Sequence, residues 1–477
     1  MNKKLDIDLV FTSHPTMIYD LNGDIRNKPL NIIDEINEIN FYIKNVINYL
    51  KKNNINNVKI SSWCGGDRDG NPYVNSIITQ NLMKKINYDL DIRENSRNIE
   101  NFYYKYIHNE KNDIIENIDN FTSIANIDND ELINTLKIMK DEQRFIISDC
   151  EEYYHIYLIH KLSKILNKKI AIIPLFESSE TLEKSISILE ICLLNNLFVD
   201  KNIEVMLAYS DTSKMDGIID STFKLYFTQI KIHDLMKKYN KQAVFFHGRG
   251  GSFPRGGGSY KYFFDRLPNN SLNKIRVTVQ GERIYHEFGD ENKIKNTINE
   301  IFEAYDYRIQ KIKHYNYSNS FLEQIENISN KTRNEYQEFI IKNDISNYFI
   351  NNTHYQYLSE LYCGSRPIKR NNKQNIKIND IRTITWVFGW SSIDFYLPWW
   401  LGYNKEFHNF VMNENFLPWN NLVEQIHEHI FKSKLTAQIE EPLLQKHKEL
   451  MLIITEKNNS ISKNEIINKI IKQKYIG

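Results

Sequence analysis

A repeated pattern of short apolar runs, each followed by a polar cluster, most constrains what this chain can fold into. Each run is rich in β-forming residues, and a charged or glycine-rich cluster follows it at once. Long segments with helical spacing, such as Leu30–Lys51, Leu182–Leu197 and Asn292–Lys313, separate the runs. The runs that show this pattern are Asp8–Phe11, Val58–Ile60, Ile170–Phe176, Ile203–Tyr209, Ala243–Phe246 and Ile275–Val279.

Strands that alternate with helices of this length predict a parallel α/β arrangement. Polar clusters at the carboxyl ends of several strands are typical of a barrel whose chemistry gathers on that face. Because helical segments dominate the 477 residues, we expect an α/β fold, a (β/α)8 TIM-type barrel with many additional α-helices. We expect residues 1–477 to form a single domain.

Composition excludes several classes of protein. A formal net charge of +1 gives no reason to expect a nucleic-acid partner. The four cysteines lack C-x-x-C spacing, which predicts reduced thiols and argues against a disulfide framework or a zinc site. The sequence has no apolar run of about 18 residues and no signal-like leader, so we expect no membrane partner and a cytoplasmic location.

The segment Phe245–Gly258 reads FFHGRGGSFPRGGG and directly follows an apolar run. Glycines let the backbone approach an anion closely, and Arg249 and Arg255 supply permanent cations. The segment is not a Walker loop, because no Gly-Lys-Ser/Thr follows, and Phe253 breaks the dinucleotide fingerprint. It predicts a site for a small, highly charged anion, with a flexible surface loop as the alternative.

Four further side chains follow predicted strands closely. His14 lies in TSHPT, where a histidine is placed for proton transfer near neutral pH. Glu177 and Asp211 each follow an apolar strand, and together they suit a hard cation such as Mg²⁺. Taken separately, each carboxylate is more typical of a helix N-cap. Lys214 follows Asp211 closely and supplies another cation.

Three more arginines complete the candidate anion-binding set. Arg93, Arg366 and Arg382 are each flanked by turn or strand signals, although any one of them alone is more typical of a surface ion pair. His427 and His429 fall on different faces of a helix, and we expect both to be solvated.

The cluster Gly65–Pro72 reads GGDRDGNP and spaces Asp67, Asp69 and Asn71 as an EF-hand loop does. The twelfth position of such a loop would be Ile78, where a bidentate glutamate is required. We therefore reject the calcium-loop interpretation.

Together these clusters resemble the phosphoenolpyruvate carboxylase family of the bacterial and plant type. The resemblance runs from about Thr12 to Gly402, and the order of the motifs makes it specific. The motifs are TSHPT (12–16), SWCGGDRDGNPYV (62–74), LDIRENS (90–96), PLFES (174–178), YSDTSK (209–214), FHGRGG (246–251), RVTVQGE (276–282), GSRPIKR (364–370), RTITWVFGW (382–390) and LPWWLG (397–402).

This resemblance implies a barrel enzyme, commonly a homotetramer, that joins phosphoenolpyruvate and bicarbonate to give oxaloacetate and phosphate. It implies an anaplerotic carboxy-lyase that uses Mg²⁺ or Mn²⁺. The roles that it implies are a catalytic base for His14, metal ligands for Glu177 and Asp211, anion-binding arginines for Arg93, Arg249, Arg366 and Arg382, a mobile-loop arginine for Arg255, and positions near the substrates for Trp63 and Lys214.

The chain also departs from this family. It is about half the usual length, and Met17, Pro254 and Asp394 stand where the family usually has Glu or Gln, Gly, and Arg. The sequence after LPWWLG lacks the recognisable segment with which family members bind inhibitory aspartate or malate. We therefore expect an active, streamlined carboxylase with weakened feedback inhibition, and the alternative is a catalytically decayed protein that still binds phosphoenolpyruvate.

Overall fold

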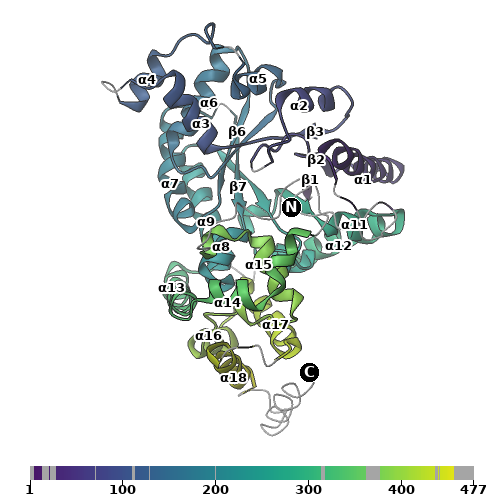
Figure 1. Cartoon of the computed structure of the whole chain (residues 1–477), viewed down its shortest axis with the longest axis vertical. Helices are drawn as coiled ribbons and strands as arrows, with labels where there is room; N and C mark the ends of the chain where they lie inside the picture. Colours follow the sequence, from purple (N-terminus) through teal and green to yellow (C-terminus); the bar gives the residue numbers. More distant parts are fainter. Residues whose placement is uncertain are drawn as a thin grey trace.

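A computed structural model gives the fold of the chain (Figure 1). It describes residues 5–12, 21, 28, 30–69, 71–109, 113–127, 129–198, 200–312, 317–360, 377–435, 439 and 441–455. Within these residues no helix is long and apolar enough to cross a membrane.

Parallel strands form the centre of the molecule. The strands are β1 (Asp6–Thr12), β2 (Val58–Ser62), β3 (Asp89–Leu90), β4 (Ile92–Asn95), β5 (Arg144–Ser148), β6 (Ala171–Phe176), β7 (Asn202–Ala208), β8 (Gln242–Gly248) and β9 (Lys274–Gln280). Their order is β3-β2-β1-β9-β8-β7-β6-β5-β4, and every pairing is parallel.

Asp91 alone separates β3 from β4, so these two short strands act as one interrupted strand. β3 pairs with β2, and β4 pairs with β5. A parallel bridge between Asp67 and Arg93 continues the contact with the chain that follows β2. The ring therefore closes with eight strand positions, which confirms the expected barrel.

Helices between successive strands cover the barrel. They are α1 (Ile32–Lys52), α2 (Ser76–Met83), α3 (Ser96–Tyr106), α4 (Ile114–Asn120), α5 (Glu131–Ile138), α6 (Tyr153–Ile165), α7 (Ser179–Leu194), α8 (Ser210–Asp216), α9 (Ile218–Lys238) and α10 (Tyr260–Asp265). Side-chain caps begin several of them: Asn31 accepts hydrogen bonds from the first turn of α1, and Ser178 forms a capping box on α7.

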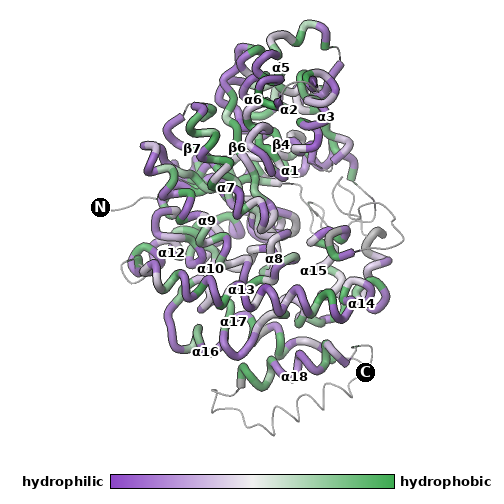
Figure 2. The backbone as a smooth tube through the Cα atoms, turned by 90° about the vertical axis from the view of Figure 1, so that its left-hand side faces the viewer, coloured by the Kyte–Doolittle hydropathy of each residue, from purple (hydrophilic) through white to green (hydrophobic). Residues whose placement is uncertain are grey.

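The chain after β9 is helical. It contains α11 (Glu282–Phe288), α12 (Glu291–Gln310), α13 (Asn319–Lys342), α14 (Ile345–Asn352), α15 (Thr383–Ser392), α16 (Lys405–Asn413), α17 (Leu417–Lys432) and α18 (Glu441–Thr455). The elements from α13 onward lie against one end of the barrel (Figures 1 and 2). Their apolar core includes residues of α9, so this layer packs directly on a barrel helix.

A layer of buried charges lies inside the barrel near the amino ends of its strands. Arg276 is 1% exposed in its side chain and pairs with Asp8 and Asp91 at 2.7 Å and with Glu204 at 2.5 Å. Burial opposes the charged guanidinium, yet the three carboxylates raise the pKa of Arg276 above its usual range. Burial also raises the pKa of Asp91 to about 6. The guanidinium of Arg276 lies 4.4 Å from the centre of the Phe246 ring, which belongs to a small apolar cluster with Ile173.

Candidate active site

A cavity of about 110 Å³ lies at the carboxyl ends of the strands, the face on which the strand-end clusters were expected. It is formed by residues that follow β2, β6, β7 and β8, together with the start of α15. The predicted site residues that line it are Trp63, Arg93, Glu177, Asp211, Lys214, Arg255 and Arg382.

Arg93, on β4, lies among three carboxylates in the wall of this cavity. Its Nη2 is 2.6 Å from Asp69 and 3.1 Å from Glu177, and its Nη1 is 3.5 Å from Asp67. The guanidinium also lies 5.2 Å from the centre of the Trp63 ring. Although burial opposes the charge, these carboxylates raise the pKa of Arg93 well above its usual range. Arg93 is therefore a permanent cation that holds the acidic side of the cavity together.

Glu177 directly follows β6 and faces this acidic side. Burial raises its pKa to about 7, the charges of Asp69 and Asp211 add to the shift, and Arg93 opposes it. A nearby cation would stabilise the charged form of such a buried carboxyl group. Among the described residues, no group of three or more His, Cys, Asp or Glu side chains is placed to hold a metal ion.

Asp211 and Lys214 lie in the first and last turns of the short helix α8 and line the same cavity as Arg93. The Oδ1 atom of Asp211 accepts a 2.6 Å hydrogen bond from Thr383 and lies 3.6 Å from Nζ of Lys214. Nζ of Lys214 donates to the carbonyl of Ile381 at 2.8 Å. The segment that begins α15 thus holds both charged side chains, and Arg382 from the same segment lines the cavity.

The glycine-rich segment forms the remaining wall. Phe253–Arg255 form a short 3-10 helix, η1, and Pro254 occupies its first turn, where a missing N–H costs little. Arg255 donates to Ser210 at 3.2 Å and to Gln280 at 3.0 Å, which directs its guanidinium into the cavity.

Arg249 lies outside the lining of this cavity. Its Nε donates to the carbonyl of Gly256 at 3.2 Å, and its Nη2 donates to the carbonyl of Gly258. The guanidinium lies 4.6 Å from the centre of the Tyr260 ring. Burial lowers the pKa of Arg249 to about 10, with Arg283 adding to the effect. In this conformation Arg249 is hydrogen-bonded to the backbone of the glycine-rich segment and does not line the cavity.

Some sequence predictions fall elsewhere. His14, Met17 and Arg366 lie outside the described residues. Asp394 has a φ of 51°, a left-handed conformation that aspartate adopts more readily than most residues, and its carboxylate pairs with Lys434 at 2.5 Å.

The expectation that His429 is solvated is wrong. Its ring lies 5.0 Å from Trp399 and 5.8 Å from Phe253, measured between ring centres. It is therefore part of the aromatic packing behind the glycine-rich segment.

Sequence reasoning assigned no site role to several polar residues of the cavity, among them Asp69 and Gln280. Asp69 makes the shortest ion pair of Arg93, and Gln280 accepts a hydrogen bond from Arg255. Both belong to motifs that the sequence shows, GGDRDGNP and RVTVQGE, so position within a motif was an available signal.

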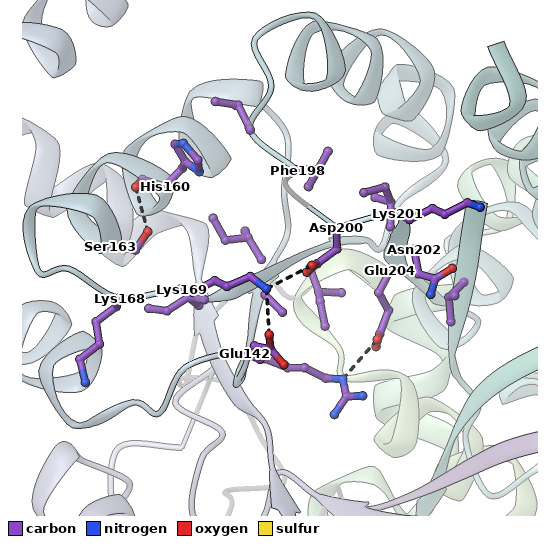
Figure 3. A pocket seen from close by; sticks show the side chains of 18 of the residues that line it. Glu142, His160, Ser163, Lys168, Lys169, Phe198, Asp200, Lys201, Asn202 and Glu204 are labelled. Carbon is purple, nitrogen blue, oxygen red and sulfur yellow. Dashed lines mark hydrogen bonds and ion pairs between the residues drawn. The ribbon is translucent and has the colours of Figure 1, made fainter. Parts of the chain in front are cut away.

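A larger cavity of about 510 Å³ lies at the opposite end of the strands (Figure 3). Nζ of Lys169 lies 2.8 Å from Glu142 and 3.5 Å from Asp200, and Arg144 lies 3.2 Å from Glu204. These side chains come from segments that precede β5, β6 and β7 or from the starts of those strands. Because its central charges are paired and the strand-end clusters lie at the other face, this cavity is not the candidate active site.

Comparisons with known proteins agree with the motifs. The family model for phosphoenolpyruvate carboxylase matches residues 30–110 and 108–473 of this chain. A phosphoenolpyruvate carboxylase of Nitrosomonas europaea is 31% identical over 258 residues, which are 51% of this chain and 27% of that protein. One of Rhodopseudomonas palustris is 32% identical over 250 residues, which are 50% of this chain and 26% of that protein. The chain thus spans about a quarter of the length of these curated relatives in the aligned part.

Proposed function

Since the chain belongs to the phosphoenolpyruvate carboxylase family, we propose that it joins phosphoenolpyruvate and bicarbonate to give oxaloacetate and phosphate. The observation that carries the proposal is the single cavity that brings a carboxylate pair together with Lys214, Arg255 and Arg382. A trianionic substrate and bicarbonate both need cations around them, and the reaction transfers a phosphoryl group between them. Positioning and charge neutralisation supply most of the catalysis of such transfers.

Glu177 and Asp211 are the residues that would hold Mg²⁺ or Mn²⁺. Both line the same cavity; burial chiefly raises the pKa of Glu177, and the nearby charges of Asp69 and Asp211 add to that shift. Mg²⁺ is usually bound by one or two carboxylates together with waters and substrate oxygens, so a pair is a sufficient protein contribution. When bound, the cation would draw charge from the oxygens of phosphoenolpyruvate.

The cationic side of the cavity would bind the substrate anions. Arg255 and Arg382 carry permanent charges, and Lys214 is fixed by its bond to the Ile381 carbonyl. We assign Arg255 to the phosphoryl group, because the phosphoryl group moves and the glycine-rich segment lets its cation follow. Lys214 and Arg382 would then orient the carboxylate of phosphoenolpyruvate.

The proposed reaction has two steps. Bicarbonate oxygen attacks the phosphorus, the bond to the enol oxygen breaks, and carboxyphosphate and the enolate form. Carboxyphosphate then loses its proton to a base and splits into carbon dioxide and phosphate, and the enolate carbon bonds to the carbon dioxide. We assign the base to His14 from the sequence alone; a positioned base contributes about 10²–10⁴-fold.

An assay of oxaloacetate tests the proposal directly. Purified protein is mixed with phosphoenolpyruvate, bicarbonate and Mg²⁺, and oxaloacetate is followed by its reduction with NADH and malate dehydrogenase. We expect Asp211→Asn to abolish the signal and Asp200→Asn, at the opposite end of the barrel, to leave it unchanged. Bicarbonate labelled with ¹⁸O should place label in the released phosphate, because its oxygen bonds to phosphorus.

Two outcomes would reject the proposal. Absence of oxaloacetate at micromolar enzyme, with phosphoenolpyruvate still bound, would favour the decayed binding protein. Phosphate without label would exclude transfer to bicarbonate.

We expect His14→Asn to bind phosphoenolpyruvate but form no oxaloacetate, and full carboxylation by this variant would remove His14 from the mechanism. Strong inhibition by millimolar aspartate would contradict the expectation of weakened feedback inhibition.

A further inference from the structure

Arg266 is a buried cation that makes no direct ion pair with the described residues. The residue is 5% exposed, and its Nε and Nη2 atoms find no hydrogen-bond partner among the described residues. Its guanidinium lies 4.6 Å from the centre of the Phe253 ring, whose face attracts a cation but carries no net charge. Burying an unpaired charge is costly, so an arginine in this position calls for a compensating group.

The other buried arginines of the barrel show what such compensation looks like. Arg93 and Arg276 are surrounded by carboxylates, which raise their pKa above the usual range. Burial instead lowers the pKa of Arg266 to about 10, and Tyr209, Tyr262 and Asp265 oppose the shift only in part.

The neighbouring carboxylate of Asp265 is committed elsewhere. One of its oxygens lies 3.2 Å from Nζ of Lys261 and accepts a hydrogen bond from Asn421, also at 3.2 Å. It therefore leaves the guanidinium of Arg266 without a direct ion pair.

Arg266 lines a cavity of about 10 Å³ behind the glycine-rich segment. A space of this size holds one water molecule or one monatomic ion. Ser213, Ser221 and Thr222 add hydroxyl groups to its wall, and Phe253 and Gly256 come from the glycine-rich segment. Within the part of the chain that the structure describes, no carboxylate lines it.

The first turns of α9 add a positive potential. The cavity lies beside Ile218 and Ser221, and α8 and α9 lie side by side there (Figure 1). No side chain caps the amino end of α9, whose helix dipole is positive at that end. Asp220 in the first turn accepts a hydrogen bond from Ser329 at 2.8 Å and pairs with Lys224 at 3.2 Å, so its charge is already matched.

We propose that this cavity binds a monatomic halide anion, chloride in the cell, held by Arg266 and the hydroxyl of Ser213. A water molecule would satisfy the hydrogen bonds of the guanidinium but would leave its charge uncompensated. Phosphate and carboxylates are too large for the space. The ion would lie behind the same segment whose Arg255 lines the candidate active site, and it would fix that segment against α8 and α9.

Thermal unfolding tests the site without any use of enzymatic activity. A ligand that binds only the folded protein raises the Tm with a saturable dependence on its concentration. At constant ionic strength, we expect replacement of gluconate by chloride or bromide to raise the Tm by a few degrees. Arg266→Met should lose this rise and should unfold at a higher temperature than the unchanged protein in gluconate, since no buried charge remains. Lys331→Met, which removes an exposed lysine paired with Glu406, is the matched control and should keep the full halide response.

Diffraction from crystals of the unaltered protein soaked in bromide supplies a second test, which does not depend on the variant folding. We expect an anomalous peak in contact with the guanidinium of Arg266 at millimolar bromide. A water there, a peak only at molar bromide, or an equal Tm rise in Arg266→Met would overturn the proposal. If the unaltered protein forms no oxaloacetate but keeps the halide response, the result counts against the carboxylase function and still supports the anion site.

Discussion

Gly256 offers a sharp test of the glycine-rich segment. Its φ is 79°, in the left-handed region, where an alanine costs about 1–2 kcal/mol. An added Cβ would lie 2.5 Å from Cδ1 of the Tyr209 ring and 2.7 Å from its Cβ. Tyr209 is 6% exposed, and its hydroxyl is held 2.8 Å from Nδ1 of His247, so the ring cannot move aside. Overpacking of this kind costs about 1–3 kcal/mol.

The two penalties of Gly256→Ala together amount to about 2–5 kcal/mol against the observed conformation. The segment can escape this strain by shifting, which breaks the hydrogen bonds of Arg255 to Ser210 and Gln280. Even a 2 kcal/mol penalty moves the equilibrium between the original and shifted segment by about 30-fold. We therefore expect kcat/KM for carboxylation to fall by at least about tenfold, with a smaller effect on Tm than a core substitution would have.

Gly251→Ala is the matched control, because its added Cβ would find no atom nearer than 3.8 Å. We expect this variant to keep the activity and Tm of the unchanged protein. The assays are the oxaloacetate assay and limited proteolysis of the segment, which should be cut faster only in Gly256→Ala. If the two alanine variants behave alike in both assays, the backbone conformation at Gly256 does not control the glycine-rich segment.

Three further predictions concern charged residues. Arg276→Met should lower the free energy of unfolding by about 3–5 kcal/mol at pH 7.5, because it leaves buried carboxylates unpaired. Chemical denaturation should show the loss shrinking toward pH 5, where Asp91, whose pKa burial already raises to about 6, takes up a proton in the folded variant. Mg²⁺ should raise the Tm of the unchanged protein and of Lys331→Met but not of Glu177→Gln; an equal rise in Glu177→Gln would remove that carboxylate from the metal site. Lys214→Met should lower kcat/KM by about 10- to 150-fold, from the loss of one charge-assisted contact, and an unchanged kcat/KM would show that Lys214 does not contact substrate.

The barrel could be predicted because most of its strands are apolar runs that can be recognised in the sequence. The six predicted runs correspond to β1, β2, β6, β7, β8 and β9. β3 and β4 carry the alternating polar residues of LDIREN, which the local pattern does not distinguish from a loop. β5 is only Arg144–Ser148, with three apolar residues between a partly exposed arginine and a serine. Strands as short as these carry too little local pattern, so tertiary contacts decide them.

The site could be predicted in its chemical inventory but not in its contacts. Strand ends placed Glu177 and Asp211 at one face, as a parallel barrel requires. The bonds that fix Asp211 and Lys214 come instead from Thr383 and Ile381, about 170 positions further along the chain, where no local pattern indicates a contact. Long-range packing of the helical layer on α8 supplies this half of the site.

Arginine motifs predict where a cation lies but not what its charge does there. Arg93 and Arg249 were expected to serve alike, yet carboxylates surround the first and backbone carbonyls hold the second. Arg255 donates to the neutral side-chain oxygens of Ser210 and Gln280, and its guanidinium lines the cavity. Arg266, which no motif marked, is buried with unpartnered nitrogens among the described residues. The function of each guanidinium therefore follows from the charge of its partners, and neutral partners or none identify the arginines that are electrostatically suited to bind an anion.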